Sequence, residues 1–230
     1  MDATPFHRGG TPDGEPVVLI HGFSGTWRNW VPVLPALERE FDVLAAGLAG
    51  DHGCPGLPGE AEVGVRADDD REAKRLRRQF GASYWIGQRS AGIRHLLARP
   101  RFRRFALRDV IAHGERVPPA EAMAMAEGQA GCEIFWDLFN AIEEAGPPVA
   151  FDGIDVPTLI VWGTADRILP LKTCADGYRR LLPHAEWRLL NGLGHIPMYD
   201  DPALVADVIA GHVRRVEAGA ATPAAARPSA

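Results

Sequence analysis

Two short runs of aliphatic and β-branched residues, more than 130 positions apart, most constrain how this chain can fold. They are EPVVLIHG (15–22) and VPTLIVWGTAD (156–166), and each passes from apolar residues into a glycine-containing loop. Such runs are typical of strands that are buried on both faces of a parallel sheet. The segments 41–50 and 185–195 have a similar character. We therefore expect an α/β protein built around a parallel sheet flanked by helices.

Helices are predicted between these strands. Residues 26–40 and 174–183 have apolar residues at helical spacing, and the segment from 67 to 149 is mostly helical in pattern and rich in charge. The segment 200–216 opens with Asp201 as a helix N-cap and Pro202 at the first helical position. The tail 217–230 is rich in Ala and Pro, and we expect it to be disordered.

Composition restricts the classes of partner and compartment. The 230 residues carry a formal net charge of −5, which gives the whole chain no electrostatic reason to bind nucleic acid or an anionic membrane. Cys54, Cys132 and Cys174 are odd in number and irregularly spaced, which favours free thiols in a reducing compartment. No apolar run reaches membrane-spanning length, and the N-terminus lacks a signal-peptide pattern. These features predict a cytoplasmic protein without membrane insertion.

Four segments, taken in order, resemble the α/β-hydrolase fold superfamily of esterase- and lipase-like enzymes. VVLIHGFSGTWRNW looks like the strand and oxyanion loop, and FDVLAAGLAGDHGCP resembles the next strand and its glycine turn. VPTLIVWGTADRILP is similar to the strand before the catalytic acid, and AEWRLLNGLGHIPMYDDP is similar to the segment with the catalytic histidine. Each match alone is weak, but four in the family's order predict its fold.

The resemblance places the catalytic acid at Asp166 and the base at His195. Both residues follow directly after a predicted strand, so in a parallel sheet both should lie at the edge where ligands bind. A carboxylate there can orient the imidazole and stabilise its charged form. The backbone N–H of Phe23 is implied as an oxyanion donor, whereas His21 is expected to hydrogen-bond the loop backbone and play no part in the chemistry.

The family's nucleophile motif, Gly-x-Ser-x-Gly, is absent. Its nearest match is GQRSAG (87–92), in which Gly92 follows Ser90 at the right distance but Gln88 stands where the first glycine belongs. If Ser90 is the nucleophile, residues 84–87 form a central strand before it, and the backbone N–H of Ala91 is the second oxyanion donor.

The rival interpretation makes residues 67–149 a helical lid and leaves the central strands and the elbow out of the sheet. The 12 arginines between 71 and 116 favour it, because several of them fall where a central strand and its helices would need buried surface. Their interleaving with acids indicates a solvated helical face, which argues against a peptide- or nucleic-acid-binding module. Both interpretations remain open at the level of sequence.

The resulting prediction has four parts along the chain. Residues 1–66 and 150–216 are expected to form the two halves of the α/β core, with the lid between them and the tail after them. The function implied is hydrolysis of a small, apolar ester or lactone, the alternative being a relative without its nucleophile that at most binds an apolar ligand. No cofactor or metal is predicted, since Asp51, His52 and Cys54 are irregularly spaced for a metal site. The residues expected to line the pocket or lid are Trp30, Trp85, Phe135, Trp136 and Phe139.

Overall fold

The structure is a computed structural model that describes residues 6–48, 70–145 and 156–220. The candidate metal residues Asp51, His52 and Cys54 lie outside the described residues, as does most of the predicted tail. The side chains of Ser90 and Ala91 are also outside the description, although their backbone belongs to a described helix.

Within the described residues, five strands form two sheets. The strands are β1 (Phe6–Gly10), β2 (Pro16–Ile20), β3 (Asp42–Ala46), β4 (Leu159–Gly163) and β5 (Glu186–Leu190). In the first sheet β3 lies in the centre, parallel to β2 and antiparallel to β1. The second sheet is the parallel pair β4 and β5. The four strands expected from the sequence are therefore confirmed, and the α/β class with them; β1 was not predicted.

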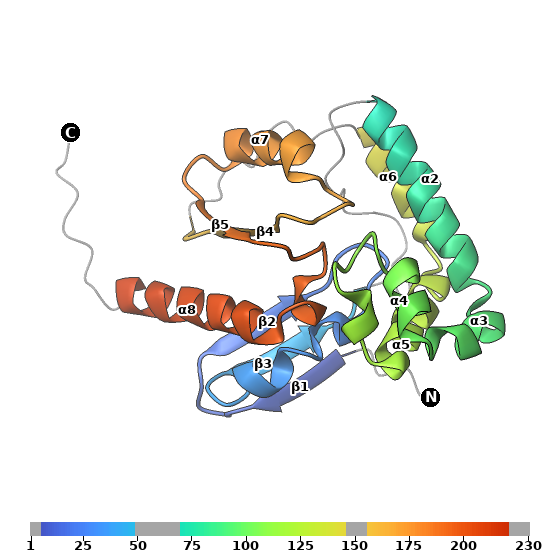
Figure 1. The fold of residues 1–230 in the computed structure, drawn as a ribbon. Helices are drawn as coiled ribbons and strands as arrows, with labels where there is room; N and C mark the ends of the chain where they lie inside the picture. The colour runs from blue at the N-terminus through green and yellow to red at the C-terminus, as the bar shows by residue number, and fades with distance from the viewer. Residues whose placement is uncertain (1–5, 49–69, 146–155, 221–230) are drawn as a thin grey trace.

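Helices make up most of the remaining described chain. The α-helices are α1 (Leu34–Leu37), α2 (Asp70–Gly87), α3 (Ser90–Leu97), α4 (Pro100–Ala106), α5 (Pro119–Ala130), α6 (Phe135–Ala145), α7 (Leu171–Leu181) and α8 (Pro202–Ala220). The 3₁₀ turns are η1 (Trp27–Trp30), η2 (Gly114–Arg116) and η3 (Pro197–Tyr199). Figure 1 shows α7 beside β4 and β5, α8 between the two sheets, and α2 to α6 gathered at one end of the molecule.

One hydrophobic core joins the two sheets. Val17, Leu19 and Val43 point from the first sheet into it, and Leu190 at the end of β5 enters it from the second sheet. Helices α1 and α8 pack against each other across this core. The core therefore fixes the ends of β2 and β5 relative to each other, and the loops that follow these strands carry the predicted site.

The structure differs from three expectations, one of which held only for the alternative with Ser90 on an elbow. The helix expected over 26–40 is broken into η1 and the short α1, because Pro32 lacks the N–H that a continuous helix would need. The strand at 84–87, required if Ser90 stands on a strand-to-helix elbow, does not form: these residues are the last turn of α2. In addition, α8 continues to Ala220, so residues 217–220, predicted as tail, are helical.

Candidate active site

The turn after β4 holds Asp166 by its backbone neighbours. The Ile168 and Leu169 N–H groups donate to Asp166 Oδ1 at 2.8 and 2.9 Å, and the Asp166 N–H donates to the Gly163 carbonyl. This is a side-chain-capped turn of the kind that aspartate favours. The Asp166 side chain is only 6% exposed. One carboxylate oxygen is thus committed to the turn, and the other is left for a partner.

That partner is His195, on the loop after β5. Its Nδ1 lies 2.8 Å from Asp166 Oδ2, so Nδ1–H donates to the carboxylate. The bond fixes the neutral imidazole in the tautomer with its lone pair on Nε2. Within the described ranges, Nε2 of His195 has no hydrogen-bond partner, and the side chain is 35% exposed. The ring is therefore held in place and keeps one nitrogen able to accept a proton.

The loops that carry these two residues touch along their backbones. The Ala165 N–H donates to the Leu193 carbonyl at 2.9 Å, and the Gly192 N–H donates to Thr164 Oγ1 at 2.8 Å. A Cβ on Gly163 would lie 2.3 Å from the Leu193 carbonyl oxygen, so this approach needs glycine. The acid and histidine loops form one rigid unit.

Asp200 is a further part of this unit that the sequence did not single out. Its buried carboxylate accepts N–H groups from Gly194, Ala112 and His113 at 2.7–3.1 Å. The residue before the histidine is thereby joined to the segment between α4 and η2. In the sequence, Asp200 is noticeable only as the neighbour of Asp201. The predicted helix N-cap at Asp201 was enough to explain this pair of aspartates, so Asp200 was not singled out.

The loop after β2 is shaped by His21, as expected. His21 is buried; its Nδ1 lies 2.9 Å from the Gly22 carbonyl oxygen, and its Nε2 accepts the Leu48 N–H at 3.1 Å. Because Nε2 accepts, Nδ1 carries the proton. A turn closes between the Gly25 N–H and the Gly22 carbonyl, leaving the Phe23 N–H without an acceptor among the described residues. A free N–H here is what an oxyanion donor requires.

The Phe23 side chain belongs to an aromatic cluster with helices α2 and α6. Its ring centroid is 4.9 Å from Phe135 and 5.5 Å from Phe80. Phe135 is fully buried and Phe139 nearly so, with centroids 6.5 Å apart, and Trp136 lies at the edge of the group. Three of the five predicted pocket residues therefore pack together beside the candidate oxyanion loop.

The other two predicted pocket residues lie elsewhere. Trp85 is 58% exposed and stacks under the guanidinium of Arg89, 3.8 Å from its ring centre. Trp30 is half-buried and packs against the core that joins the two sheets. The structure brings neither of them into the aromatic cluster.

Ser90 begins α3, after a two-residue turn that follows α2. The turn is attached to the end of α5, because the Gln88 side-chain amide donates to the Ala130 carbonyl at 2.9 Å. Helix α3 packs against α4 and α5. Ser90 and Ala91 thus stand at the start of a helix, but that helix follows another helix where the family has a strand.

Comparisons of the sequence with known proteins find only a short similarity. No family model matches the chain. Uncharacterized proteins of Mycobacterium bovis and Mycobacterium tuberculosis are 35% identical over 54 residues, which is 24% of this chain and 16% of each relative. The chain therefore matches about a sixth of the length of these curated relatives.

Solved structures are similar over nearly the whole chain. A membrane phospholipase A has a TM-score of 0.60 at 18% identity, covering 92% of this chain and 82% of that one. The Cif epoxide hydrolase from Acinetobacter nosocomialis has a TM-score of 0.61 at 14% identity (90% and 84%). An esterase from Thermogutta terrifontis has a TM-score of 0.52 at 19% identity (92% and 93%). These likenesses show that the chain has an α/β-hydrolase fold, the fold that the resemblance predicted.

The described helices include none that is both long and apolar enough to span a bilayer.

Proposed function

We propose that this chain hydrolyses a small ester- or lactone-type substrate, with His195 as the base and Asp166 as the residue that orients it. The observation that carries the proposal is the 2.8 Å bond between His195 Nδ1 and Asp166 Oδ2. A carboxylate that holds the imidazole tautomer is the arrangement by which such pairs activate a hydroxyl for acyl transfer.

In the proposed reaction the Ser90 hydroxyl is the nucleophile. His195 Nε2 takes its proton as Oγ attacks the substrate carbonyl carbon, and returns that proton to the leaving alcohol. A water activated by the same nitrogen then hydrolyses the acyl-serine. The N–H groups of Phe23 and Ala91 would stabilise the oxyanion, and the Phe23 N–H, which has no acceptor among the described residues, supports the first of these roles. The proposed chemistry uses no cofactor.

The test is covalent capture of the nucleophile with an alkyl fluorophosphonate, which reacts with serines that a base and an oxyanion hole activate. The labelled peptide is mapped by mass spectrometry. We expect the label on Ser90, and its loss in His195→Ala. A Ser83→Ala variant is the matched control, because it removes a nearby serine on α2 and should leave the labelling unchanged.

A second candidate function has its own observation. Residues 84–87 are helical, so Ser90 follows a helix instead of the strand that makes the family's elbow. On this reading the chain keeps the acid and the histidine but lacks a nucleophile, and it binds an apolar ligand near the aromatic cluster. Well-folded protein that takes no label at any serine, and that hydrolyses no short-chain nitrophenyl ester, would favour this candidate over the first.

A further inference from the structure

The charge of the chain is divided very unevenly. Residues 70–116 hold 12 arginines and one lysine against four carboxylates, while the rest of the chain holds 12 Lys and Arg against 26 Asp and Glu. Although the net charge of the chain is −5, residues 70–116 form a strongly cationic segment in an otherwise acidic protein. Such asymmetry points to a partner that one part of the molecule recognises by charge.

Among the described residues, several of these cations have no carboxylate partner. Lys74 and Arg78 on α2, Arg99 and Arg101 around the start of α4, and Arg116 are exposed. None of the five forms an ion pair with a carboxylate in the described part of the chain. Their charges are thus available to a partner. By contrast, Arg103 is buried and donates to backbone carbonyls, so it serves the fold.

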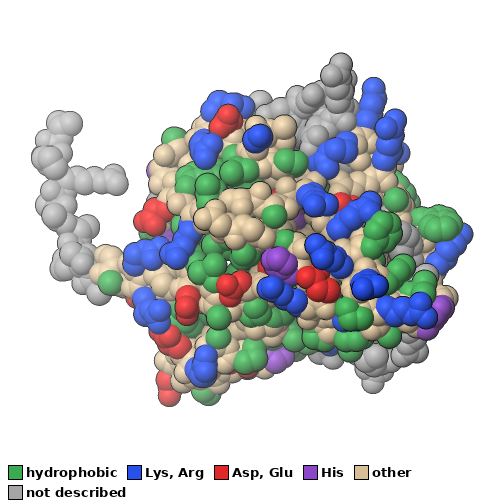
Figure 2. Space-filling model, viewed as in Figure 1, with side chains coloured by type: hydrophobic (Ala, Val, Ile, Leu, Met, Phe, Trp, Pro, Cys, Tyr) green, Lys and Arg blue, Asp and Glu red, His purple; other side chains and the backbone are tan. Residues whose placement is uncertain are grey.

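Large aromatic side chains are exposed among these cations. Trp85 at the end of α2 is 58% exposed, and Phe105 at the end of α4 is 59% exposed; each has an arginine over its ring (Arg89 and Arg108). Figure 2 shows Lys and Arg side chains with hydrophobic ones between them over the right-hand part of the molecule, where Figure 1 places α2, α3 and α4.

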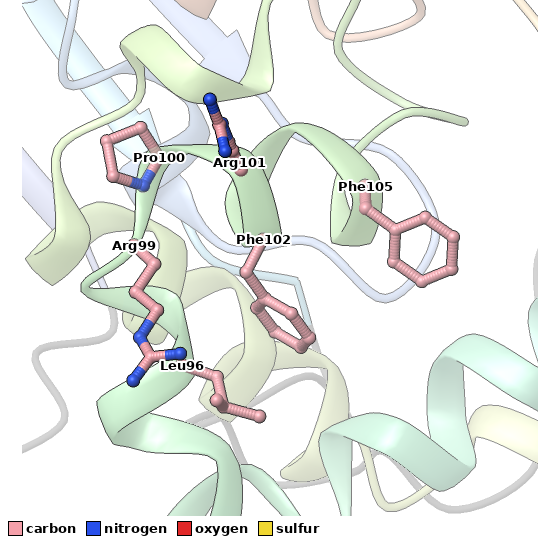
Figure 3. A pocket seen from close by; sticks show the side chains of 6 residues that line it. All are labelled: Leu96, Arg99, Pro100, Arg101, Phe102 and Phe105. Atoms are coloured by element: carbon pink, nitrogen blue, oxygen red, sulfur yellow. The ribbon is translucent and has the colours of Figure 1, made fainter.

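An open groove lies between α3 and α4 on the same segment. Apolar side chains and two arginines line it: Leu96, Arg99, Pro100, Arg101, Phe102 and Phe105 (Figure 3). Apolar side chains with guanidinium groups beside them suit contact with a lipid that carries an anionic head.

We propose that the face formed by α2, α3 and α4 binds peripherally to a bilayer surface rich in anionic phospholipid. Exposed tryptophan and phenylalanine side chains enter the headgroup region, and unpaired arginines contact lipid phosphates. Binding at a surface needs no membrane-spanning helix. The exposed apolar side chains and the apolar groove favour a lipid over nucleic acid, to which the same cations could be attracted. The proposal is independent of the hydrolase assignment, because it uses no residue of the candidate active site.

The test is co-sedimentation of the full chain with vesicles. One set contains equal parts of phosphatidylglycerol and phosphatidylcholine, and the other contains phosphatidylcholine alone. We expect binding to the anionic vesicles only, and weaker binding as salt rises. A triple variant, Arg78→Gln, Arg99→Gln and Arg101→Gln, should lower the partition coefficient at least about tenfold, since each cation near an anionic surface contributes.

The matched control removes the same charge elsewhere. Arg39, Lys172 and Arg188 are exposed on other elements, and changing all three to glutamine should leave vesicle binding within about twofold of the wild type. An equal loss in both triple variants would overturn the proposal, because it would reflect net charge alone.

Two further readouts separate the lipid from its rivals. Vesicle binding should shift the tryptophan emission of the wild type to shorter wavelength, and Trp85→Phe should remove most of that shift. No preference for anionic vesicles, or displacement of the protein from vesicles by a small excess of polyuridylate, would overturn the proposal. Circular dichroism of each variant checks that it is folded, and the fluorophosphonate result has no bearing on any of these outcomes.

Discussion

At the scale of the residue, Asp166 has two separate tasks, one for each oxygen. Oδ1 accepts the two N–H groups that close the turn after β4, and Oδ2 orients His195. A substitution can remove one task and keep the other. Asparagine keeps one side-chain oxygen, which can still accept the turn N–H groups, whereas alanine keeps neither oxygen. The fold and the chemistry of this site can therefore be tested apart.

We expect Asp166→Asn to cost less than about 1 kcal/mol in the free energy of unfolding, because the amide oxygen can still accept the turn N–H groups, and Asp166→Ala to cost about 1–3 kcal/mol. Both variants should lose the orientation of His195 and with it the fluorophosphonate labelling. Urea unfolding measures the first effect and labelling rate the second. Equal unfolding energies for the two variants would contradict the assigned role of Oδ1.

Asp200 provides the second residue-scale prediction. Asp200→Ala leaves three N–H groups without their acceptor, two of them from the segment before η2, and should lower the free energy of unfolding by about 3 kcal/mol. Asp201→Ala removes only the cap bond to Leu204 at the start of α8, and should cost about 1 kcal/mol. Denaturant titration of the two neighbours compares them directly; a larger cost at 201 would be inconsistent with the assignment.

The sequence was most informative about residues that follow strands. The family resemblance placed Asp166 and His195, and the position of each directly after a strand predicted that they lie at one edge; the structure puts the two side chains 2.8 Å apart. Asp200 was missed since its three partners come from positions about 6 and 88 residues away, and no local pattern reports such contacts. Trp85, predicted to line the pocket or lid, lies on α2 and is mostly exposed, because a helical pattern alone does not show which face of the helix an aromatic side chain joins.

At the scale of elements, two groups of contacts help to attach the helices from 70 to 145 to the core, besides the bonds to Asp200. One is the aromatic cluster around Phe23. The other is a polar group in which Arg28 of η1 pairs with Glu121 of α5 at 2.7 Å. The Tyr199 hydroxyl lies 3.0 Å from the Arg28 carbonyl oxygen and 3.2 Å from Glu121 Oε2. Three elements from distant parts of the sequence meet at this hydroxyl.

This junction predicts a dependence of stability on alkaline pH. Burial, helped by Glu121, raises the pKa of Tyr199 well above its usual value. The stability that comes from the neutral phenol is present in full below the unfolded pKa of about 10, and is lost as the pH rises from there through the folded pKa. Tyr199→Phe should cost about 1 kcal/mol at pH 8 and should weaken the loss of stability between pH 8 and 11.

The measurement is the free energy of unfolding in urea at several pH values for both proteins. Burial also raises the pKa of Tyr178. Tyr199→Phe should therefore still lose some stability at alkaline pH, but less than the wild type. Parallel pH profiles for wild type and Tyr199→Phe would show that the hydroxyl is not held neutral by this junction.

Elements were predicted with unequal success for identifiable reasons. The strands β2, β3 and β4 consist largely of aliphatic residues, and β5 (EWRLL) ends in two leucines, whereas β1 (FHRGG) has two glycines and almost no apolar signal. Proline broke the helix expected over 26–40. The run at 84–87 could suit a strand or a helix, and the helical pattern of the preceding charged residues decided it in favour of α2.

At the scale of the whole molecule, the sheet of the fold is divided into two parts. Of the described strands, only β3 pairs with β2, and only β5 pairs with β4. Along β2, Val17 and Leu19 face the core, while Val18 and Ile20 on the opposite face are more than half exposed. An apolar face beside an unpaired strand edge favours association between chains.

The last prediction concerns this face. We expect the wild-type protein to associate as its concentration rises, and Ile20→Lys to shift it toward the monomer, because a buried ammonium group would oppose contact between two such faces. Val156→Lys is the matched control, since Val156 is exposed on the loop before β4 and away from β2. Light scattering after size exclusion measures the mass of each protein across a range of concentrations. A wild type that stays monomeric throughout would show that the exposed side of β2 is not an association surface, and an equal effect of both lysines would assign the change to net charge.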